Sequence, residues 1–250
     1  MLRRPQSGKR IACAVAHLNI KKDVLSKARL HLDATRSSAL FAERMALVEG
    51  VTDVALLRQL GLAWAAGNQN RTSFVNALAI IPMGFKGRPW AVQLLAIKGK
   101  ELCDRIAVLG DTDKPSSGNL LTDPAWLASH DQKIVKHFAS EPTLEPAITA
   151  GNEDAVAAAL GKIGVIIPLQ ITPDEIQLLF RSASIKHKTS AGSASRKKGE
   201  FALALAEELQ DRIDKDPSSV HVPTICIAFL ISYTTNPRQA SSSLQISTTS

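Results

Sequence analysis

Short apolar runs alternate with segments that have apolar residues at helical spacing through the middle of the chain. The runs typical of buried strands are residues 45–48, 76–84, 105–113 and 132–140. The segments typical of helices packed on one side are 52–66 and 89–102, and the polar stretch 67–73 is expected to be a loop. Strands that alternate with helices form parallel sheets with right-handed crossovers. The pattern therefore predicts an α/β fold with a four-stranded parallel sheet and flanking helices.

The rest of the chain divides into regions with their own patterns. Residues 20–44 have roughly helical spacing, which predicts one or two helices that lead into the core. Residues 182–198 are basic and rich in serine, which predicts a mobile loop. The predicted organisation is a basic N-terminal segment with lead-in helices (1–44), a core (45–145), a helical insert beside the sheet (146–190), a basic loop with a C-terminal helix and an apolar segment (191–235), and a disordered tail (236–250).

The composition suits a globular protein with an ordinary core, since 45% of the 250 residues are hydrophobic. Cys13, Cys103 and Cys226 are far apart and form no CxxC pair, so the sequence implies neither a zinc site nor a disulfide framework. No apolar run approaches the roughly 20 residues of a membrane helix. The run 11–18 is also short for a signal peptide, and no small-residue cleavage site follows it. A cytoplasmic protein without a membrane segment is expected.

The net charge of +7 is unevenly distributed along the chain. Residues 1–30 hold eight Lys or Arg against Asp23 alone, and residues 177–199 hold six Lys or Arg and no acid. The remainder carries 16 basic and 22 acidic residues. An acidic body with two basic segments is expected of a protein that holds cations centrally and meets a polyanion at its edges. The alternative is a solvated surface with a basic tail.

Acidic residues follow the predicted strands. Glu49 comes after the first strand, and Asp53 lies one helical turn further on. Asp111 and Asp113 are two apart, which puts both on one face of an extended backbone, and Glu145 lies beyond the fourth strand. Ligands bind at the carboxyl ends of parallel strands, and carboxylates gathered there repel one another unless a cation neutralises them. The sequence therefore predicts a site for Mg²⁺ or Mn²⁺, with a helix cap as the second interpretation of Asp53.

Three of these stretches carry a resemblance to a known fold. "ALVEGVTD", "IIPMGFKG" and "AVLGDTD", in this order, resemble the Toprim fold, the acidic metal-binding domain of topoisomerases, primases and certain nucleases. "LDATRSSALFAERMALVEGVTDVALL" resembles the junction between the ATPase and the Toprim domain of OLD-family nucleases (overcoming lysogenisation defect). "SEPTLEPAI" (140–148) and "RKKGEFALALAEEL" (196–209) resemble later segments of that family, so that the resemblance covers roughly residues 30–212.

The resemblance implies a role for each matching position. The metal ligands would be Glu49, Asp53, Asp111, Asp113 and Glu145, with possible help from Thr143 at the second metal. Glu49 would alternatively be a general base, and Lys198 would stabilise charge on the phosphate. The implied cofactor is a pair of Mg²⁺ or Mn²⁺ ions, which activate water and stabilise the leaving oxygen. Residues expected to contact the DNA backbone are Lys186, Lys188, Arg196 and Lys197.

The chain departs from the family at the phosphate loop. There is no GxxxxGK[ST], and "PQSGKR" (5–10) lacks both the first glycine and the hydroxyl residue, so no ATPase activity is expected. The expected function is a metal-dependent DNA endonuclease. The alternatives are a non-catalytic nucleic-acid-binding remnant and another Toprim enzyme, although Tyr233 is the only tyrosine that a topoisomerase reaction could use. Expected partners are DNA and, as open alternatives, a separate ATPase polypeptide and a second copy of the chain. The six histidines show no ligand spacing, and no chemistry is assigned to them.

Overall fold

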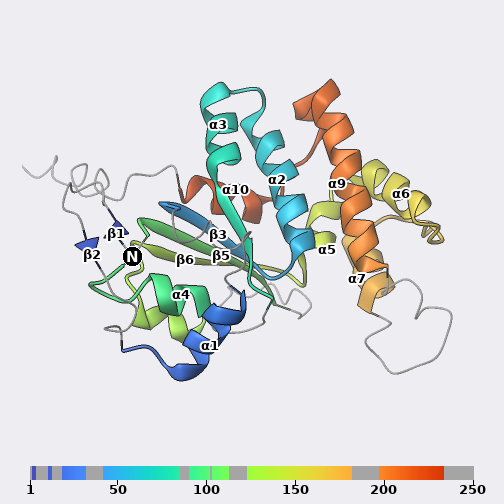
Figure 1. Cartoon of the computed structure of the whole chain (residues 1–250). Coiled ribbons are helices and arrows are strands. Elements are labelled where there is room, and N and C mark those ends of the chain that lie inside the picture. Colours follow the sequence, from blue (N-terminus) through green and yellow to red (C-terminus); the bar gives the residue numbers. More distant parts are fainter. Residues whose placement is uncertain are drawn as a thin grey trace, which may run out of the picture.

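The structure is a computed structural model of the whole chain (Figure 1). It describes residues 2–3, 11–12, 19–31, 42–84, 90–101, 103–112, 123–181 and 197–233. Several of the sequence-based predictions fall outside these ranges. They concern Asp113, Lys186, Lys188, Arg196 and the tail 236–250.

A four-stranded parallel sheet forms the centre of the molecule, as the sequence predicts. Its strands are β3 (Arg44–Val48), β4 (Ala79–Pro82), β5 (Arg105–Asp111) and β6 (Val135–Ser140). Their order is β4-β3-β5-β6, and every neighbouring pair is parallel. The N-terminal strands Leu2–Arg3 and Ile11–Ala12 form a separate antiparallel pair. Strand β3 lies between β4 and β5 in this sheet. An inner strand of a parallel sheet is buried on both faces, which explains the uninterrupted apolar run 45–48.

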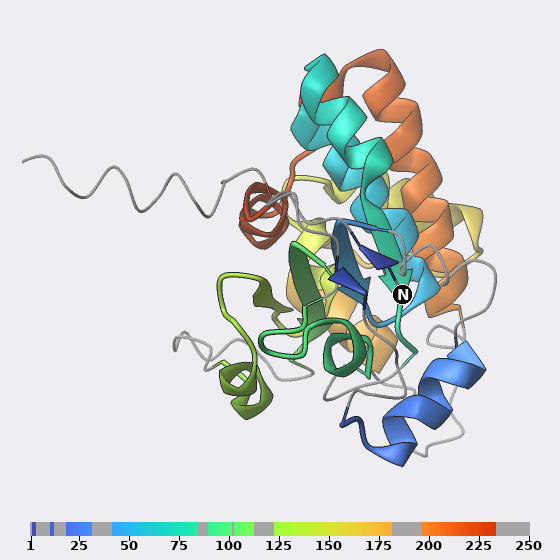
Figure 2. The same cartoon turned by 60° about the vertical axis from the view of Figure 1, so that its left-hand side comes forward.

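Helices cover both faces of this sheet (Figures 1 and 2). On one face lie α1 (Lys22–His31), α4 (Trp90–Leu95) and the 3₁₀ helix η3 (Ala125–Ser129). On the other face lie α2 (Val51–Ala65), α3 (Gln69–Ala77), α5 (Leu144–Thr149), α6 (Glu153–Lys162), α7 (Pro173–Arg181), α9 (Lys198–Lys215) and α10 (Thr224–Ile231), with the 3₁₀ turn η4 (Pro217–Ser219) after α9. None of the described helices is both long and apolar enough to cross a membrane.

The two faces give the protein two apolar cores. Met45 and Leu47 of β3 belong to the core with α1 and α4, whereas Ala46 and Val48 belong to the core with α2 and α9. Successive side chains of a strand point to opposite faces, so one short run supplies both cores. All four side chains are completely buried. Because β3 is fixed in this way, the residues that follow it are held at one edge of the sheet.

The predicted loop 67–73 is wrong, because α3 begins at Gln69. Asn68 caps this helix, and its side-chain oxygen accepts a hydrogen bond from the backbone N–H of Arg71 at 3.1 Å. Phe74 then packs edge-on against Trp64 of α2, with 6.4 Å between ring centroids. Tertiary packing therefore outweighs the polar composition of this stretch. The predicted helix 89–102 is shorter in the structure, since α4 ends at Leu95.

Candidate functional site

An open cleft of about 360 Å³ lies at the carboxyl ends of β3 and β5. Its position follows from the parallel sheet, because both strands deliver their next residues to the same edge. Four acidic residues and one lysine from four different segments line it. The lining residues are Glu49, Gly50, Thr52, Asp53, Gly84, Asp111, Glu145, Lys198 and Gly199.

Glu49 joins the ends of the two central strands. It directly follows β3, and its Oε1 accepts a hydrogen bond from the backbone N–H of Asp111 at 3.2 Å. The backbone of Glu49 also holds the neighbouring segment, since its carbonyl accepts the N–H of Gly84 at 2.8 Å. Gly84 has a φ of 70°, a backbone conformation that favours glycine. The glutamate is therefore fixed in both its main chain and its side chain.

Asp53 combines two of the roles considered for it. Its Oδ2 accepts a hydrogen bond from the backbone N–H of Gly50 at 2.8 Å, which closes the N-terminal turn of α2. The same carboxylate lines the cleft. The N-cap residue of α2 is Gly50, and Asp53 supports this cap from the first turn of the helix while it remains in the candidate site.

Glu145 enters the cleft from the first turn of α5 and is only 2% exposed. Its Oε2 accepts a hydrogen bond from the hydroxyl of Thr143 at 2.8 Å. The same oxygen lies 3.1 Å from Nζ of Lys198, which belongs to the first turn of α9. Thr143 therefore acts on the site through Glu145, because it is not itself among the lining residues.

The adjacent lysines of the basic run point in different directions. Lys198 reaches the cleft, whereas Lys197 donates a hydrogen bond to the carbonyl of Ile163 at the end of α6. An ammonium group in that place interacts favourably with the carboxyl end of a helix. In this structure, Lys197 is thus a contact between α6 and α9, although the sequence motif suggested a contact with DNA.

The cleft holds more negative charge than its one lysine compensates. Burial, with smaller contributions from Glu145 and Glu49, raises the pKa of Asp53 to about 6. Burial raises the pKa of Asp111 to about 8, with additional contributions from Glu145 and Asp53. Burial alone would lower the pKa of Lys198, but the surrounding carboxylates, Glu145 first, raise it above its usual value. The site therefore favours the binding of further positive charge.

The structure brings together most of the residues proposed from the sequence. Asp113 lies outside the described residues, and the described Asp, Glu, His and Cys side chains include no group of three or more that could hold a metal ion as they stand. The carboxylates of Glu49, Asp53 and Glu145 each accept a hydrogen bond from the protein, and Glu145 also forms an ion pair with Lys198. The sequence did not assign Gly50, Thr52 or Gly199 to the site, because these lining residues carry no charged motif.

The fold and site define an α/β protein with an acidic cleft at the carboxyl edge of a parallel sheet. No protein-family model matches the sequence, and no curated protein matches it either. Among solved structures, the chain is similar to the C-terminal region of the Burkholderia pseudomallei OLD protein, with 16% identity, a TM-score of 0.47, and coverage of 80% of this chain and 98% of that one. It is also similar to the C-terminal region of the Xanthomonas campestris pv. campestris OLD protein, with 16% identity, a TM-score of 0.44, and coverage of 81% and 97%.

Proposed function

We propose that the chain is a metal-dependent nuclease that hydrolyses DNA phosphodiester bonds at the acidic cleft. The observation that supports this most strongly is the convergence of four carboxylates and one lysine at one edge of the sheet. Two of these carboxyl groups, Asp53 and Asp111, have raised pKa values, first because they are buried and second because neighbouring carboxylates repel their charged forms. A cleft of this kind binds cations and, through them, the phosphate groups of a polyanion.

The donor set fits a hard divalent cation in its chemistry, because every candidate ligand is a carboxylate oxygen. Glu49, Asp53, Asp111 and Glu145 would hold Mg²⁺ or Mn²⁺, with Asp113 as a further candidate ligand. Two bound ions would supply an activated water and stabilise the leaving oxygen. The two ions, like the choice of DNA as substrate, rest on the resemblance of the motifs and are part of the proposal.

Lys198 supplies the positive charge that the chain itself brings to the cleft. Its ion pair with the buried Glu145 holds the ammonium group at the site, at an N···O distance of 3.1 Å. A positioned cation stabilises a phosphoryl transition state, in which negative charge accumulates on the oxygens. The side chain of Glu49 is held at the strand ends by the backbone N–H of Asp111, so it could hold a metal ion or orient a water molecule there. We therefore assign charge stabilisation to Lys198 and metal or water binding to Glu49.

Tyr233 argues against a topoisomerase reaction. The side chain is 2% exposed, and its hydroxyl donates a hydrogen bond to the carbonyl of Met45 at 2.8 Å. Burial raises its pKa well above 10, which makes the phenolate nucleophile hard to form. Tyr233 is the only tyrosine in the sequence. A phosphotyrosine intermediate is therefore no part of the proposed function.

The test combines a binding measurement with a cleavage assay on the full chain. Millimolar Mg²⁺ or Mn²⁺ should raise the melting temperature, because a ligand that binds only the folded state stabilises it. The same ions should support nicking of a supercoiled plasmid without added nucleotide. Asp111→Asn should lose both effects, whereas Asp174→Asn, at an exposed acid of α7, should keep them.

Two outcomes would contradict the proposal in different ways. If neither metal shifts the melting temperature of the wild-type protein, the carboxylates do not bind a cation. If metal and DNA bind but no strand is cut by wild-type protein under any metal condition, the chain is the non-catalytic nucleic-acid-binding protein considered from the sequence.

Lys197 and Lys198 offer a matched pair for the role of the cleft lysine. Lys198→Ala should lower the single-turnover cleavage rate by about 100-fold, with little change in DNA affinity, because its charge acts mainly in the transition state. Lys197→Ala removes a neighbouring lysine of the same charge that contacts Ile163 instead of the cleft. Its cleavage rate should stay close to that of the wild type. Equal loss of rate and affinity in both variants would mean that Lys198 is only a contact to the DNA backbone.

A further inference from the structure

One oxygen of the Glu145 carboxylate is fully engaged by the protein itself. Its Oε2 accepts the hydroxyl of Thr143 at 2.8 Å and lies 3.1 Å from Nζ of Lys198. A carboxylate oxygen has about two positions that accept a donor, and both are taken here. Glu145 and Lys198 line the acidic cleft, whereas Thr143 is not among its lining residues. The ammonium group of Lys198 is therefore the partner that Oε2 has on the side of the cleft.

A metal ion and this ammonium group compete for Glu145. Two positive charges on one carboxylate repel each other, and in a partly buried site that repulsion is only weakly screened. The other oxygen of Glu145 belongs to the same small group, so an ion bound there would still lie close to the ammonium. Binding of a divalent cation at Glu145 thus requires that the ammonium group of Lys198 move away.

The ammonium group can leave only when other charges replace the ion pair. Glu145 is 2% exposed, and a buried charge that loses its charged partner is strongly destabilising. The side chain of Lys198 is 39% exposed and ends in a flexible stem, so it has room to turn toward the cleft. A DNA phosphate in the cleft would give the ammonium group a new anion, while a cation would neutralise Glu145. The exchange is therefore favourable when phosphate and cation arrive together.

We propose that Lys198 keeps a divalent cation from Glu145 until a DNA phosphate draws the ammonium group away. This inference rests on the proposed nuclease function and adds an order of binding to it. Without DNA, the cleft takes one cation at Glu49, Asp53 and Asp111, and Glu145 takes a second one only when DNA is bound. Because coupled binding is reciprocal, the second cation also strengthens the binding of DNA. The cleft then holds its full set of ions only on its substrate.

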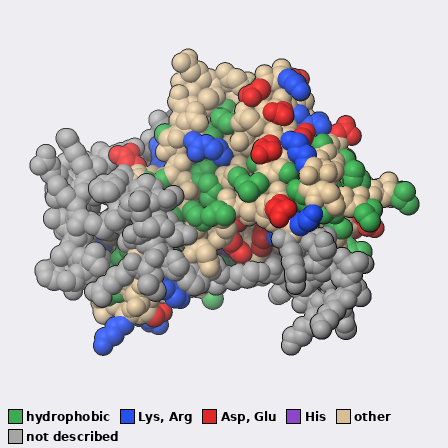
Figure 3. Space-filling model, turned by 45° about the vertical axis from the view of Figure 1, so that its right-hand side comes forward, with side chains coloured by type: hydrophobic (Ala, Val, Ile, Leu, Met, Phe, Trp, Pro, Cys, Tyr) green, Lys and Arg blue, Asp and Glu red, His purple; other side chains and the backbone are tan. Residues whose placement is uncertain are grey.

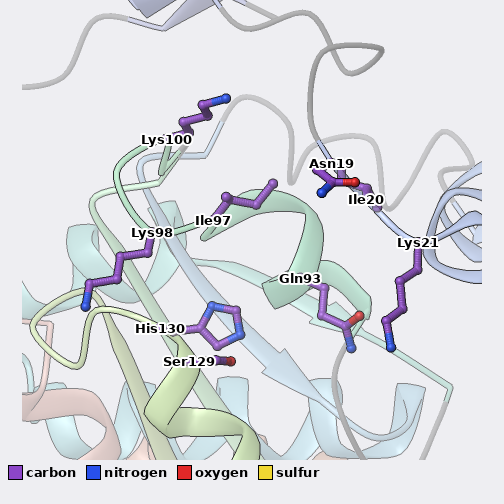
Figure 4. Close-up of a pocket in the computed structure, with 9 residues that line it drawn as sticks. All are labelled: Asn19, Ile20, Lys21, Gln93, Ile97, Lys98, Lys100, Ser129 and His130. Carbon is purple, nitrogen blue, oxygen red and sulfur yellow. The ribbon is translucent and has the colours of Figure 1, made fainter.

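A second cavity, the lysine-lined cavity around His130, offers a control outside the cleft (Figure 4). It has a volume of about 380 Å³, and residues 96–100 and 129–130, which precede β5 and β6, form part of its wall. It is thus close to the amino ends of these strands and shares no lining residue with the acidic cleft. Replacing its exposed Lys98 changes the net charge as much as replacing Lys198, without altering the cleft.

The experiment counts the Mn²⁺ ions bound to the full-length protein without DNA, from the loss of the free-ion signal in electron paramagnetic resonance. The wild type should bind one ion. Lys198→Met keeps the length of the side chain and removes its charge, so it should bind one ion more. Lys198→Gln should show the same gain although it keeps a hydrogen-bond donor for Glu145. Adding Glu145→Gln to Lys198→Met should remove the extra ion.

A second titration adds a short DNA duplex with phosphorothioate linkages, which keep the negative charge and slow hydrolysis. The wild type should then bind one ion more than protein and duplex bind separately, whereas Lys198→Met should show no such increase. Lys98→Met and Lys197→Met should behave as the wild type in both titrations, because neither lysine lines the cleft.

The outcomes separate this inference from the proposed function. If the wild type binds Mn²⁺ and both Lys198 variants bind the same number of ions without DNA, the inference is wrong and the nuclease proposal stands. An extra ion in Lys98→Met would also overturn the inference, because net charge alone would then explain the gain. If neither the wild type nor any variant binds Mn²⁺, the proposed function itself fails.

Discussion

Asp53 and Asp111 face the same cleft but differ in what offsets their charge. Asp53 accepts a backbone hydrogen bond from Gly50, which stabilises its ionised form and limits the rise of its pKa. No backbone hydrogen bond of this kind limits the rise in the pKa of Asp111. The backbone N–H of Asp111 instead donates to the side chain of Glu49. Asp111 is therefore the carboxyl group that gains most from protonation, or from a cation nearby.

This difference predicts how the stability of metal-free protein depends on pH. The pKa of Asp111 is about 8 in the folded protein, against 3.8 for the free group, so the folded state binds the proton more tightly. Its stabilising effect is complete below about pH 4 and is lost as the pH rises to about 8. The loss has an upper limit of about 1.4 kcal/mol per pH unit for one group. Chemical denaturation between pH 5 and pH 8, in the presence of a chelator, should show falling stability.

Asp111→Asn is the informative variant, because it removes the titration and keeps the shape of the side chain. Its unfolding free energy should fall less steeply with pH than that of the wild type. Asp174→Asn, at an exposed position, serves as the control and should follow the wild-type curve. A parallel pH dependence in all three proteins would show that Asp111 titrates normally.

For single residues, the sequence predicted the positions of the carboxylates better than the contacts of the neighbouring lysines. Glu49 and Asp111 were predicted because strand ends in a parallel sheet meet at one edge. The different directions of Lys197 and Lys198 depend on where α6 ends against α9, which no local pattern encodes. The cavity around His130 was missed for a similar reason, since its residues come from three separate segments with no common motif.

Helices α2 and α3 pack so closely that one position admits only glycine. A Cβ atom at Gly61 of α2 would lie 2.9 Å from Cγ1 and 3.2 Å from Cγ2 of Val75 in α3. Val75 is 1% exposed and, as a β-branched residue, has little rotamer freedom with which to move away. The glycine therefore serves the packing of two helices, even though it weakens the helix that contains it.

Gly61→Ala should destabilise the protein by about 1–2 kcal/mol, because overpacking exceeds the gain in helix propensity of about 1 kcal/mol. Gly161→Ala in α6 is the matched control, since its nearest neighbour would be Cδ1 of Ile167 at 4.0 Å. That variant should be as stable as the wild type or more so. Thermal denaturation of both variants tests the prediction, and a more stable Gly61→Ala protein would contradict it.

Secondary structure was predicted correctly where the hydrophobic pattern was strong. It was predicted incorrectly where contacts between helices determine the structure. The strands β3 and β5 were found because their apolar runs are buried on both faces. Helix α3 was missed because Gln69–Ala77 is mostly polar and is held by a cap at Asn68 and by the contact of Phe74 with Trp64. Sequence periodicity cannot predict a contact between two helices such as α2 and α3, because the whole fold sets the angle at which they cross.

On the scale of the whole molecule, charge of each sign is gathered in separate places. The acidic cleft and the lysine-lined cavity lie at different ends of sheet strands. Elsewhere, charges of both signs lie together, as Figure 3 shows for one face of the described surface. Lys162 of α6, for example, lies 2.8 Å from a carboxylate oxygen of Glu208 in α9. Such surface pairs contribute little to stability and leave the surface nearly neutral.

The basic loop gives a prediction for binding by the whole protein. Lys186 and Lys188 lie outside the described residues, in a stretch of the sequence (177–199) that holds six Lys or Arg and no acidic residue. Their joint replacement by Ala should weaken DNA binding for all sequences and make the log–log salt slope shallower, by roughly 0.9 for each phosphate that the protein no longer neutralises. Lys162→Ala is the control, because that lysine is already paired with Glu208. An unchanged slope in the double variant would place the DNA elsewhere on the protein.

The two cores differ in how much of the chain each one needs. The core beside α1 and α4 uses residues 24–135, whereas the core beside α2 extends from Ala46 to Tyr233. A ribosome delivers these segments in order, so one face of the sheet can be covered while the other still waits for α9 and α10. We expect the nascent protein to expose an apolar sheet face until its last helices emerge. Its yield in cells should therefore depend on the supply of chaperones that bind apolar segments during translation.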